Sequence, residues 1–146
     1  MLDTLRVRPL EDGDTDAALK LYNELTYGPV CADPDAFRTV LRHPGTTVLG
    51  AYDGDCLCAM LTLHVLPNVT WGARPYGLIE NVVTSEQYRA RGIGRHLMQA
   101  ALRHAWAANA YKVMLMTGQK RGAKEFYEKV GFSSEDKHAM VARREF

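Results

Sequence analysis

The stretch IENVVTSEQYRARGIGRHL, from Ile79 to Leu97, joins a predicted strand to a predicted helix through a loop rich in arginine and glycine. Its first six residues include several valine and isoleucine side chains, which favour a strand. From Gly92 to Ala108 the apolar residues recur on one stripe, as in an amphipathic helix. A helix N-terminus carries about half a positive charge and several unpaired backbone N–H groups. The arginine-rich loop is therefore predicted to lie at the positive end of a helix.

The composition of this loop is typical of an anion-binding site. Gly92 and Gly94 lack side chains, so the backbone can adopt positive φ and approach a ligand closely. Arg89, Arg91 and Arg95 add forked donors that match phosphate oxygens. Together these features predict a cradle for a phosphate or pyrophosphate group. The alternative is that Gly92 only shapes the turn and that the arginines are solvated.

Other phosphate-binding patterns fit this segment poorly. The Gly-Lys-Ser/Thr ending of a Walker loop is missing, and a dinucleotide fingerprint would need a third glycine near Leu97. That fingerprint would also follow the first strand of a doubly wound sheet, whereas this loop follows a later strand. The whole chain has 18 basic and 17 acidic side chains, a formal charge of +1, so no polycationic field for nucleic acid is expected.

The remaining patterns predict the elements on either side of this segment. Before it we expect a strand at residues 5–10, a helix through 18–25, a helix at 35–41, and strands at 48–52, 57–65 and 77–84. After it we expect a strand at 112–117, a helix at 121–130 that ends before Gly131, and a strand at 138–146. This order predicts one α/β (α+β) domain over residues 1–146. It would contain a single mixed, mostly antiparallel sheet of about six strands flanked by about four helices.

The segment from Arg89 to Gly94 resembles a family motif. It matches the Gln/Arg-x-x-Gly-x-Gly/Ala pattern of the GCN5-related N-acetyltransferases (GNAT). The preceding IENVVT and the later EFYEKVGF resemble that family's neighbouring segments, and the resemblance covers almost the whole chain in order. It implies the acyl-CoA N-acyltransferase fold, with a sheet that splays between LIENVVT and KVMLMT. It also implies an enzyme that transfers the acetyl group of acetyl-CoA to a primary amine of a small molecule, by direct attack in a ternary complex.

The resemblance also implies which residues bind the donor. The strand edge would hydrogen-bond the pantetheine arm, and the loop would wrap the pyrophosphate with its backbone N–H groups. The residues implied are Val82, Val83 and Thr84 for the arm, and Arg89, Ala90, Arg91, Gly92, Ile93, Gly94 and Arg95 for the pyrophosphate. Many relatives carry an Asn shortly after the strand that corresponds to KVMLMT, where this chain has Gly118. Thr117 or Lys120 could replace that contact.

Two side chains are predicted to carry the chemistry. An aliphatic amine has a pKa near ~10, so at pH 7 only about one molecule in a thousand is neutral and able to attack. Glu80, a carboxylate within an apolar strand, is the candidate base that takes the amine's proton. The resemblance gives Tyr127 the role of general acid toward the CoA sulfur. The alternatives are a Glu80 paired with one of the arginines, and a Tyr127 that packs as an aromatic residue at a helix end.

The acceptor is expected between the first helical region and residues 64–76. The candidate residues there are Tyr22, Tyr27, Trp71, Arg74 and Tyr76. Rival functions are a non-catalytic acyl-CoA-binding or regulatory module on the same fold, and a protein N-terminal or lysine acetyltransferase.

The remaining expectations concern partners and location. No metal, nucleic-acid or membrane partner is expected. Three cysteines and the lack of a signal-like segment favour a reducing, cytoplasmic setting. A homodimer that pairs through HAMVARREF is possible, because that strand often mediates pairing in the resembling family.

Overall fold

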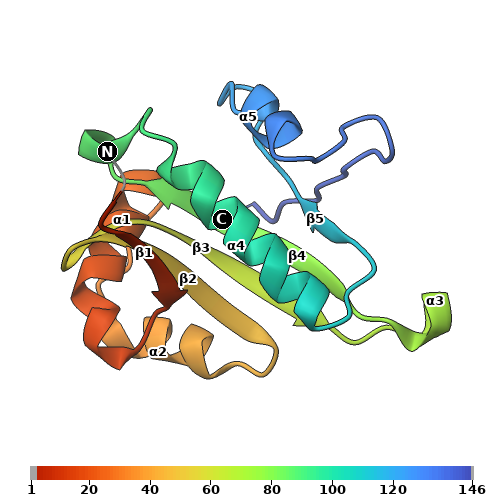
Figure 1. Ribbon diagram of the computed structural model, residues 1–146, viewed down its shortest axis with the longest axis horizontal. Helices are drawn as coiled ribbons and strands as arrows, with labels where there is room; N and C mark the ends of the chain where they lie inside the picture. The colour runs from red at the N-terminus through yellow and green to blue at the C-terminus, as the bar shows by residue number, and fades with distance from the viewer. Residues whose placement is uncertain (1–2, 146) are drawn as a thin grey trace. The chain divides into compact units, whose positions relative to one another are not determined.

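The computed structural model describes residues 3–145 as two compact units, one ending at Leu115 and the other beginning at Met116. The first unit contains β1 (Leu5–Pro9), α1 (Thr15–Leu25), α2 (Pro34–Arg42), β2 (Thr46–Asp53), β3 (Cys56–Leu66), α3 (Thr70–Ala73), β4 (Tyr76–Thr84), α4 (Ile93–Ala107) and β5 (Val113–Leu115). It also has two short 3-10 helices, η1 (Asp12–Asp14) and η2 (Glu86–Tyr88). The second unit contains α5 (Lys124–Lys129) (Figure 1). The prediction of one domain over the whole chain stays a prediction.

The first unit is built on one mixed sheet with the strand order β1-β2-β3-β4-β5. Neighbouring strands are antiparallel except β4 and β5, which are parallel and joined through α4. The predicted Asp53-Gly54 turn closes the β2–β3 hairpin, with Gly54 in the left-handed region at φ 58°. The expected mixed, mostly antiparallel α/β sheet is therefore confirmed, with five strands in the described residues.

Helices cover both faces of this sheet. On one face α1 and α2 pack their apolar stripes on a buried cluster that includes Leu21, Phe37, Val48 and Met60. Residues that alternate with this cluster along the strands point to the other face, where α4 runs across the sheet in Figure 1. Leu97 and Met98 of α4 are completely buried there. Because α4 is anchored along its length, its N-terminal turn is held in place at the end of β4.

Two sequence predictions differ from the structure at the C-terminal side. The strand expected at 138–146 is wrong, because residues 138–145 have no regular secondary structure, and residue 146 lies outside the described part. Alternation alone cannot make a strand, since its backbone groups need a partner edge. The buried strand expected at 112–117 is reduced to the three half-buried residues of β5.

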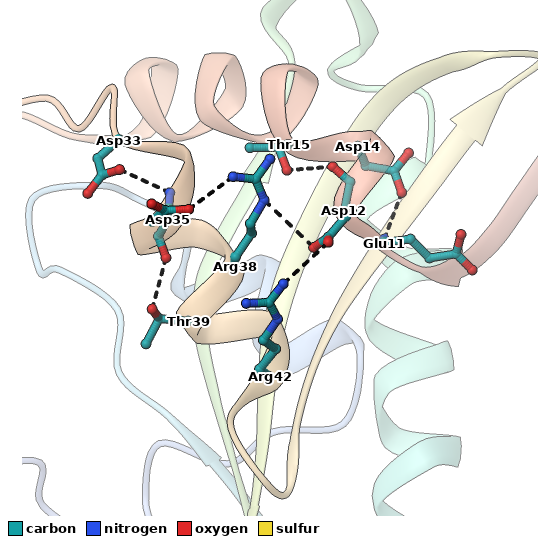
Figure 2. Close-up of polar contacts among 9 residues, drawn as sticks. All are labelled: Glu11, Asp12, Asp14, Thr15, Asp33, Asp35, Arg38, Thr39 and Arg42. Atoms are coloured by element: carbon teal, nitrogen blue, oxygen red, sulfur yellow. Dashed lines mark hydrogen bonds and ion pairs between the residues drawn. The ribbon is translucent and has the colours of Figure 1, made fainter.

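Charged side chains fasten α2 to the start of α1, as Figure 2 shows. Asp33 accepts a hydrogen bond from the backbone N–H of Asp35 at 3.0 Å and so caps α2, with Pro34 in the first turn. Along α2, Arg38 and Arg42 both reach Asp12 of η1, with N···O distances of 4.0 and 3.5 Å. The polar side of α2 thus fixes its orientation while its apolar side packs on the sheet.

Asp14→Asn is expected to destabilise the protein by about 1 kcal/mol at pH 7. Both carboxylate oxygens of Asp14 accept bonds from Arg8, at 2.9 and 3.0 Å, and this pairing lowers the pKa of Asp14 to about 2. A shift of nearly two units corresponds to at most about 2.5 kcal/mol, which the half-exposed Arg8 reduces through solvent screening. Because the folded pKa is depressed, this stability is complete above about pH 4 and disappears as the pH falls toward 2.

Urea unfolding at a series of pH values measures this effect. Asp16→Asn is the matched control, because Asp16 is exposed in the first turn of α1, two residues after Asp14. An Asp14→Asn loss that stayed constant down to pH 2 would show that the pairing is not its cause.

Candidate functional site

The sheet opens between β4 and β5. Ladder pairing between them covers only three positions of β4, from Gly77 to Ile79, whereas pairing of β4 with β3 continues to Thr84. Among the described residues, the outer edge of β4 from Glu80 onward therefore has no strand partner. This is the edge at which the splay was predicted. Its unpaired amide groups can accept an extended, amide-containing ligand arm as an added strand would be accepted.

A β-bulge reshapes β4 where the opening begins. Glu80 pairs with Thr62 and Val83 with Met60, so two residues of β4 lie opposite one of β3. The two residues of β4 in the bulge are Asn81 and Val82. Asn81 has a left-handed φ of 54°, which Asn tolerates better than most side chains. The bulge bends the strand and changes the direction of the backbone groups that follow it.

Beyond the bulge, one of the backbone groups at the outer edge of β4 already has a hydrogen-bond partner in the loop that follows the strand. The Ser85 N–H donates to the Cys58 carbonyl of β3 at 2.8 Å, so by alternation the polar groups of Thr84 face the outer edge. The Thr84 carbonyl there accepts a bond from Nε of Arg89 at 3.1 Å. Of the predicted arm-binding groups at Thr84, the N–H is the one that this contact leaves available.

Glu24 of α1 holds the beginning of the loop. Its carboxylate accepts bonds from the Ser85 hydroxyl at 3.3 Å and from the Glu86 N–H at 3.0 Å. The backbone then forms η2, with the Tyr88 N–H donating to the Ser85 carbonyl at 2.8 Å. Sequence reasoning missed Glu24, because nothing in its spacing indicates a contact with a loop sixty residues later.

The loop reaches α4 through two left-handed residues. Ala90 has φ 60°, and Gly92, the N-cap residue, has φ 78°. No side chain caps the helix, and its first ladder bond is donated by the His96 N–H to the Gly92 carbonyl at 3.3 Å. The N–H groups of the three residues between them thus precede the helical ladder. Such a run of free N–H groups forms a concave anion-binding nest at a positive helix end.

The three arginines of the loop do different things. Arg89 is folded back on Thr84, and the guanidinium of Arg91 lies 5.2 Å from the centre of the Tyr88 ring. Arg91 and Arg95 are exposed beside the free N–H groups. The structure thus brings the predicted donor-binding residues from Val82 to Arg95 into one continuous strand–loop–helix segment.

Glu80 faces the side of the sheet that α1 covers. It is half-buried and directly opposite Thr62, which is buried and hydrogen-bonded to Tyr22 of α1. Burial at this position raises the pKa of Tyr22. Within residues 3–145 no ion pair involves Glu80, so the alternative in which an arginine neutralises it is not found.

Tyr127 lies in the second unit, at the end of α5. As predicted, Gly131 ends this helix, with φ 103°, and the N–H groups of Gly131 and Phe132 bond back to the carbonyls of Glu128 and Tyr127, both at 3.1 Å. The ring of Phe132 packs on that of Tyr127, with ring centroids 6.3 Å apart. Burial raises the pKa of Tyr127.

The other predicted donor contacts also lie in the second unit. Thr117 is half-buried and Lys120 is exposed. Between them, the Gly118 carbonyl accepts a bond from the Arg121 N–H at 3.1 Å, which forms a turn. Each of these residues stays a predicted contact.

Two residues expected to bind the acceptor have structural partners instead. Arg74 donates to the carbonyls of Asn109 and Ala110, both at 3.3 Å, and so ties the β3–β4 connection to the end of α4. Trp71 stacks on Tyr111, with ring centroids 5.3 Å apart. Tyr22 interacts with Thr62, the residue of β3 opposite Glu80, and stays a predicted acceptor residue.

Among the helices described between residues 3 and 145, none combines the length and apolar character that crossing a membrane requires.

Comparisons with known proteins agree with this geometry. The family model described as "Acetyltransferase (GNAT) family" matches residues 10–132. A solved structure of a putative acetyltransferase from Agrobacterium tumefaciens str. C58 is 37% identical, with a TM-score of 0.88 over 94% of this chain and 99% of that one. A glucosamine 6-phosphate N-acetyltransferase from Trypanosoma brucei brucei is 29% identical over 94% of this chain and 95% of the relative. A solved Trypanosoma brucei acetyltransferase is 26% identical, with a TM-score of 0.81 over 95% of this chain and 99% of that one.

Proposed function

Since this chain belongs to the acetyltransferase (GNAT) family, we propose that it transfers the acetyl group of acetyl-CoA to the primary amine of a small molecule. The observation that carries the proposal is the left-handed turn through Ala90 and Gly92 into an uncapped α4. This turn leaves free N–H groups at the start of α4, between the exposed Arg91 and Arg95, and we infer that a pyrophosphate is held there.

The open edge of β4 supports the same donor. Beyond the bulge at Asn81, the edge offers amide groups to a ligand arm that itself contains amides, as pantetheine does. In this proposal Val82, Val83 and Thr84 hold the arm while the loop holds the pyrophosphate. Thr117 and Lys120 add contacts after β5.

The chemistry needs a base for the amine and an acid for the leaving sulfur. Glu80 takes a proton from the ammonium group, and the neutral nitrogen then attacks the thioester carbonyl carbon. The carbon–sulfur bond breaks, Tyr127 gives its proton to the thiolate, and the second proton lost by the nitrogen restores the Tyr127 hydroxyl. A raised pKa suits this tyrosine, because it keeps the proton on the hydroxyl at neutral pH.

An amino sugar phosphate is the acceptor we propose to test first. The trypanosomal relative is named for glucosamine 6-phosphate, and the two chains align over nearly their whole lengths. Amino acids and aminoalkylphosphonates follow as further small primary amines.

Acetyl-CoA is expected to raise the melting temperature by roughly 5–10 °C at a hundredfold excess over its Kd. Differential scanning fluorimetry measures this shift. Pantetheine, which lacks the pyrophosphate, is the control ligand. The absence of a shift would contradict the donor assignment.

A screen of small amines with detection of the released thiol then tests the transfer itself. Turnover of an amino sugar phosphate supports the proposal. Donor binding with no turnover of any small amine would favour the rival acyl-CoA-binding module, and acetylation of peptides alone would favour a protein acetyltransferase.

The homodimer and the cytoplasmic setting stay predictions, as does the absence of metal, nucleic-acid and membrane partners. Sedimentation at two protein concentrations tests the dimer. The pairing strand that suggested it is not formed in residues 138–145 of the single chain.

A further inference from the structure

We propose that His64, Thr46 and His43 form a hydrogen-bonded relay that carries the proton collected by Glu80 out to solvent. This inference rests on the proposed amine acetylation. The juxtaposition that carries it is a single hydroxyl held between two imidazole rings. Oγ1 of Thr46 lies 2.7 Å from Nδ1 of His64 and 2.9 Å from Nδ1 of His43. The two rings are 6.4 Å apart and nearly perpendicular, at 86°.

The sheet register places this relay next to Glu80. Thr46 pairs with His64, and His64 pairs with Leu78, while Glu80 pairs with Thr62 one step further along the same two strands. Side chains two residues apart on a strand share a face, so His64 and Glu80 are diagonal neighbours on the α1 side of the sheet. Diagonal neighbours are roughly 7–8 Å apart, a gap that their side chains and one bridging water can span.

Exposure decreases along the relay toward the site. His43, which follows the end of α2, is exposed, whereas Thr46 and His64 are half-buried. Beyond them, Thr62 is buried under the Tyr22 hydroxyl. The chain of polar groups therefore leads from solvent to the covered face beside Glu80. Apolar residues of α1 and α2 pack on the neighbouring positions of that face.

The proton balance of the reaction gives this path a purpose. An ammonium acceptor enters with three protons on nitrogen, and the product amide keeps one of them. Tyr127 gives one proton to the sulfur to make the neutral CoA thiol, and a second proton from the nitrogen restores the Tyr127 hydroxyl. The third proton leaves the enzyme in every turnover at neutral pH, so a base on a covered face needs an exit route.

The hydroxyl of Thr46 can pass this proton in one concerted step. His64 receives the proton on its outer nitrogen, releases its Nδ1 proton to Oγ1 of Thr46, and the hydroxyl proton moves to Nδ1 of His43. A hydroxyl donates one bond while it accepts another, so it fits between one protonated and one bare ring nitrogen. His43 then releases a proton from its outer nitrogen to water. The other titratable groups on this face include Tyr22 from α1, Tyr52 from β2, and Tyr76 and Glu80 from β4. Arg8 and Asp14 lie at Tyr52, and Arg38 and Arg42 of α2 reach Asp12 instead.

Thr46→Val tests the relay, because valine keeps the shape of threonine and removes the bridging oxygen. We expect kcat to fall about tenfold while KM for the amine is unchanged. We also expect that adding imidazole buffer restores kcat, because a small base in solution can replace the relay. Thr47→Val is the matched control, since Thr47 is the next residue of β2 and faces the other side of the sheet. It should leave kcat unchanged and independent of the buffer concentration.

Three results would overturn the relay. The first is an unchanged kcat in Thr46→Val, and the second is a lowered kcat that buffer does not restore. The third does not depend on activity. It is the finding, from ¹⁵N spectra of the histidine rings, that Thr46→Val leaves the Nδ1 signals of both His43 and His64 unchanged. An active wild type with any of these results removes the relay and keeps the proposed function. A wild type that acetylates no amine removes the proposed function and the relay with it.

Discussion

Gly92→Val is expected to weaken acetyl-CoA binding at least roughly a hundredfold, a loss of about 2.7 kcal/mol. Gly92 has φ 78°, and a β-branched residue in the left-handed region costs roughly 1–2 kcal/mol or more. The loop would relieve this strain by rotating the peptide units around position 92. That rotation turns the N–H groups at the start of α4 away from their common point, and the nest for the pyrophosphate is lost. Isothermal titration with acetyl-CoA measures the change.

Gly54→Val separates the local effect from a general loss of stability. Gly54 has the similar left-handed φ of 58°, and a Cβ atom there meets no other atom within 4 Å. This variant should lose stability to a similar extent and keep the wild-type Kd, because its turn lies in the β2–β3 hairpin. Wild-type affinity in Gly92→Val would show that the loop does not hold the donor. An equal loss of affinity in both variants would show that the effect is global.

Tyr127→Phe is expected to lower kcat by about 10²–10³ while leaving KM nearly unchanged, because it removes only a proton donor. The ring remains, so the packing on Phe132 and the end of α5 should persist and the melting temperature should stay within about 1 °C. Burial raises the pKa of Tyr127. The alkaline decrease in wild-type kcat should consequently begin only above the ordinary tyrosine pKa of about 10, and it should be missing in the variant. Steady-state rates across the pH range measure both effects.

Phe132→Leu is the complementary variant. It removes the aromatic contact with Tyr127 and leaves the hydroxyl, so we expect a lower melting temperature and a kcat within about threefold of the wild type. If Tyr127→Phe kept full turnover, the residue would be an aromatic at a helix end and nothing more. If Phe132→Leu lost as much kcat as Tyr127→Phe, the position of the ring would matter more than its proton.

The comparison of these sites shows what kind of information local sequence contains. Gly92 was predicted to begin a helix and Gly131 to follow the end of one, and both have positive φ. Such positions depend on the steric properties of one residue, so a single sequence is enough to find them. The anion loop follows from the same kind of reasoning, whereas the splay was implied by the family resemblance alone.

Contacts between distant segments could not be predicted in this way. Glu24 holds Ser85 across sixty residues, and Arg74 is bound to the end of α4 rather than to a substrate. The strand expected at 138–146 had an acceptable pattern but has no paired edge in the described residues. In each case the deciding quantity is which partner lies within bonding distance, and local propensity does not contain it.

By itself, the sequence of this protein determined most of its element order and the left-handed turn into α4, because both depend on the conformations that neighbouring residues allow, whereas the donor was implied by the resemblance to a family. Only the tertiary structure decided which side chains surround Glu80. The register of β2, β3 and β4 places Thr62, His64 and Thr46 on one face, and α1 covers that face with Tyr22. Register is a property of paired strands, because a shift of one residue would turn every one of these side chains to the opposite face.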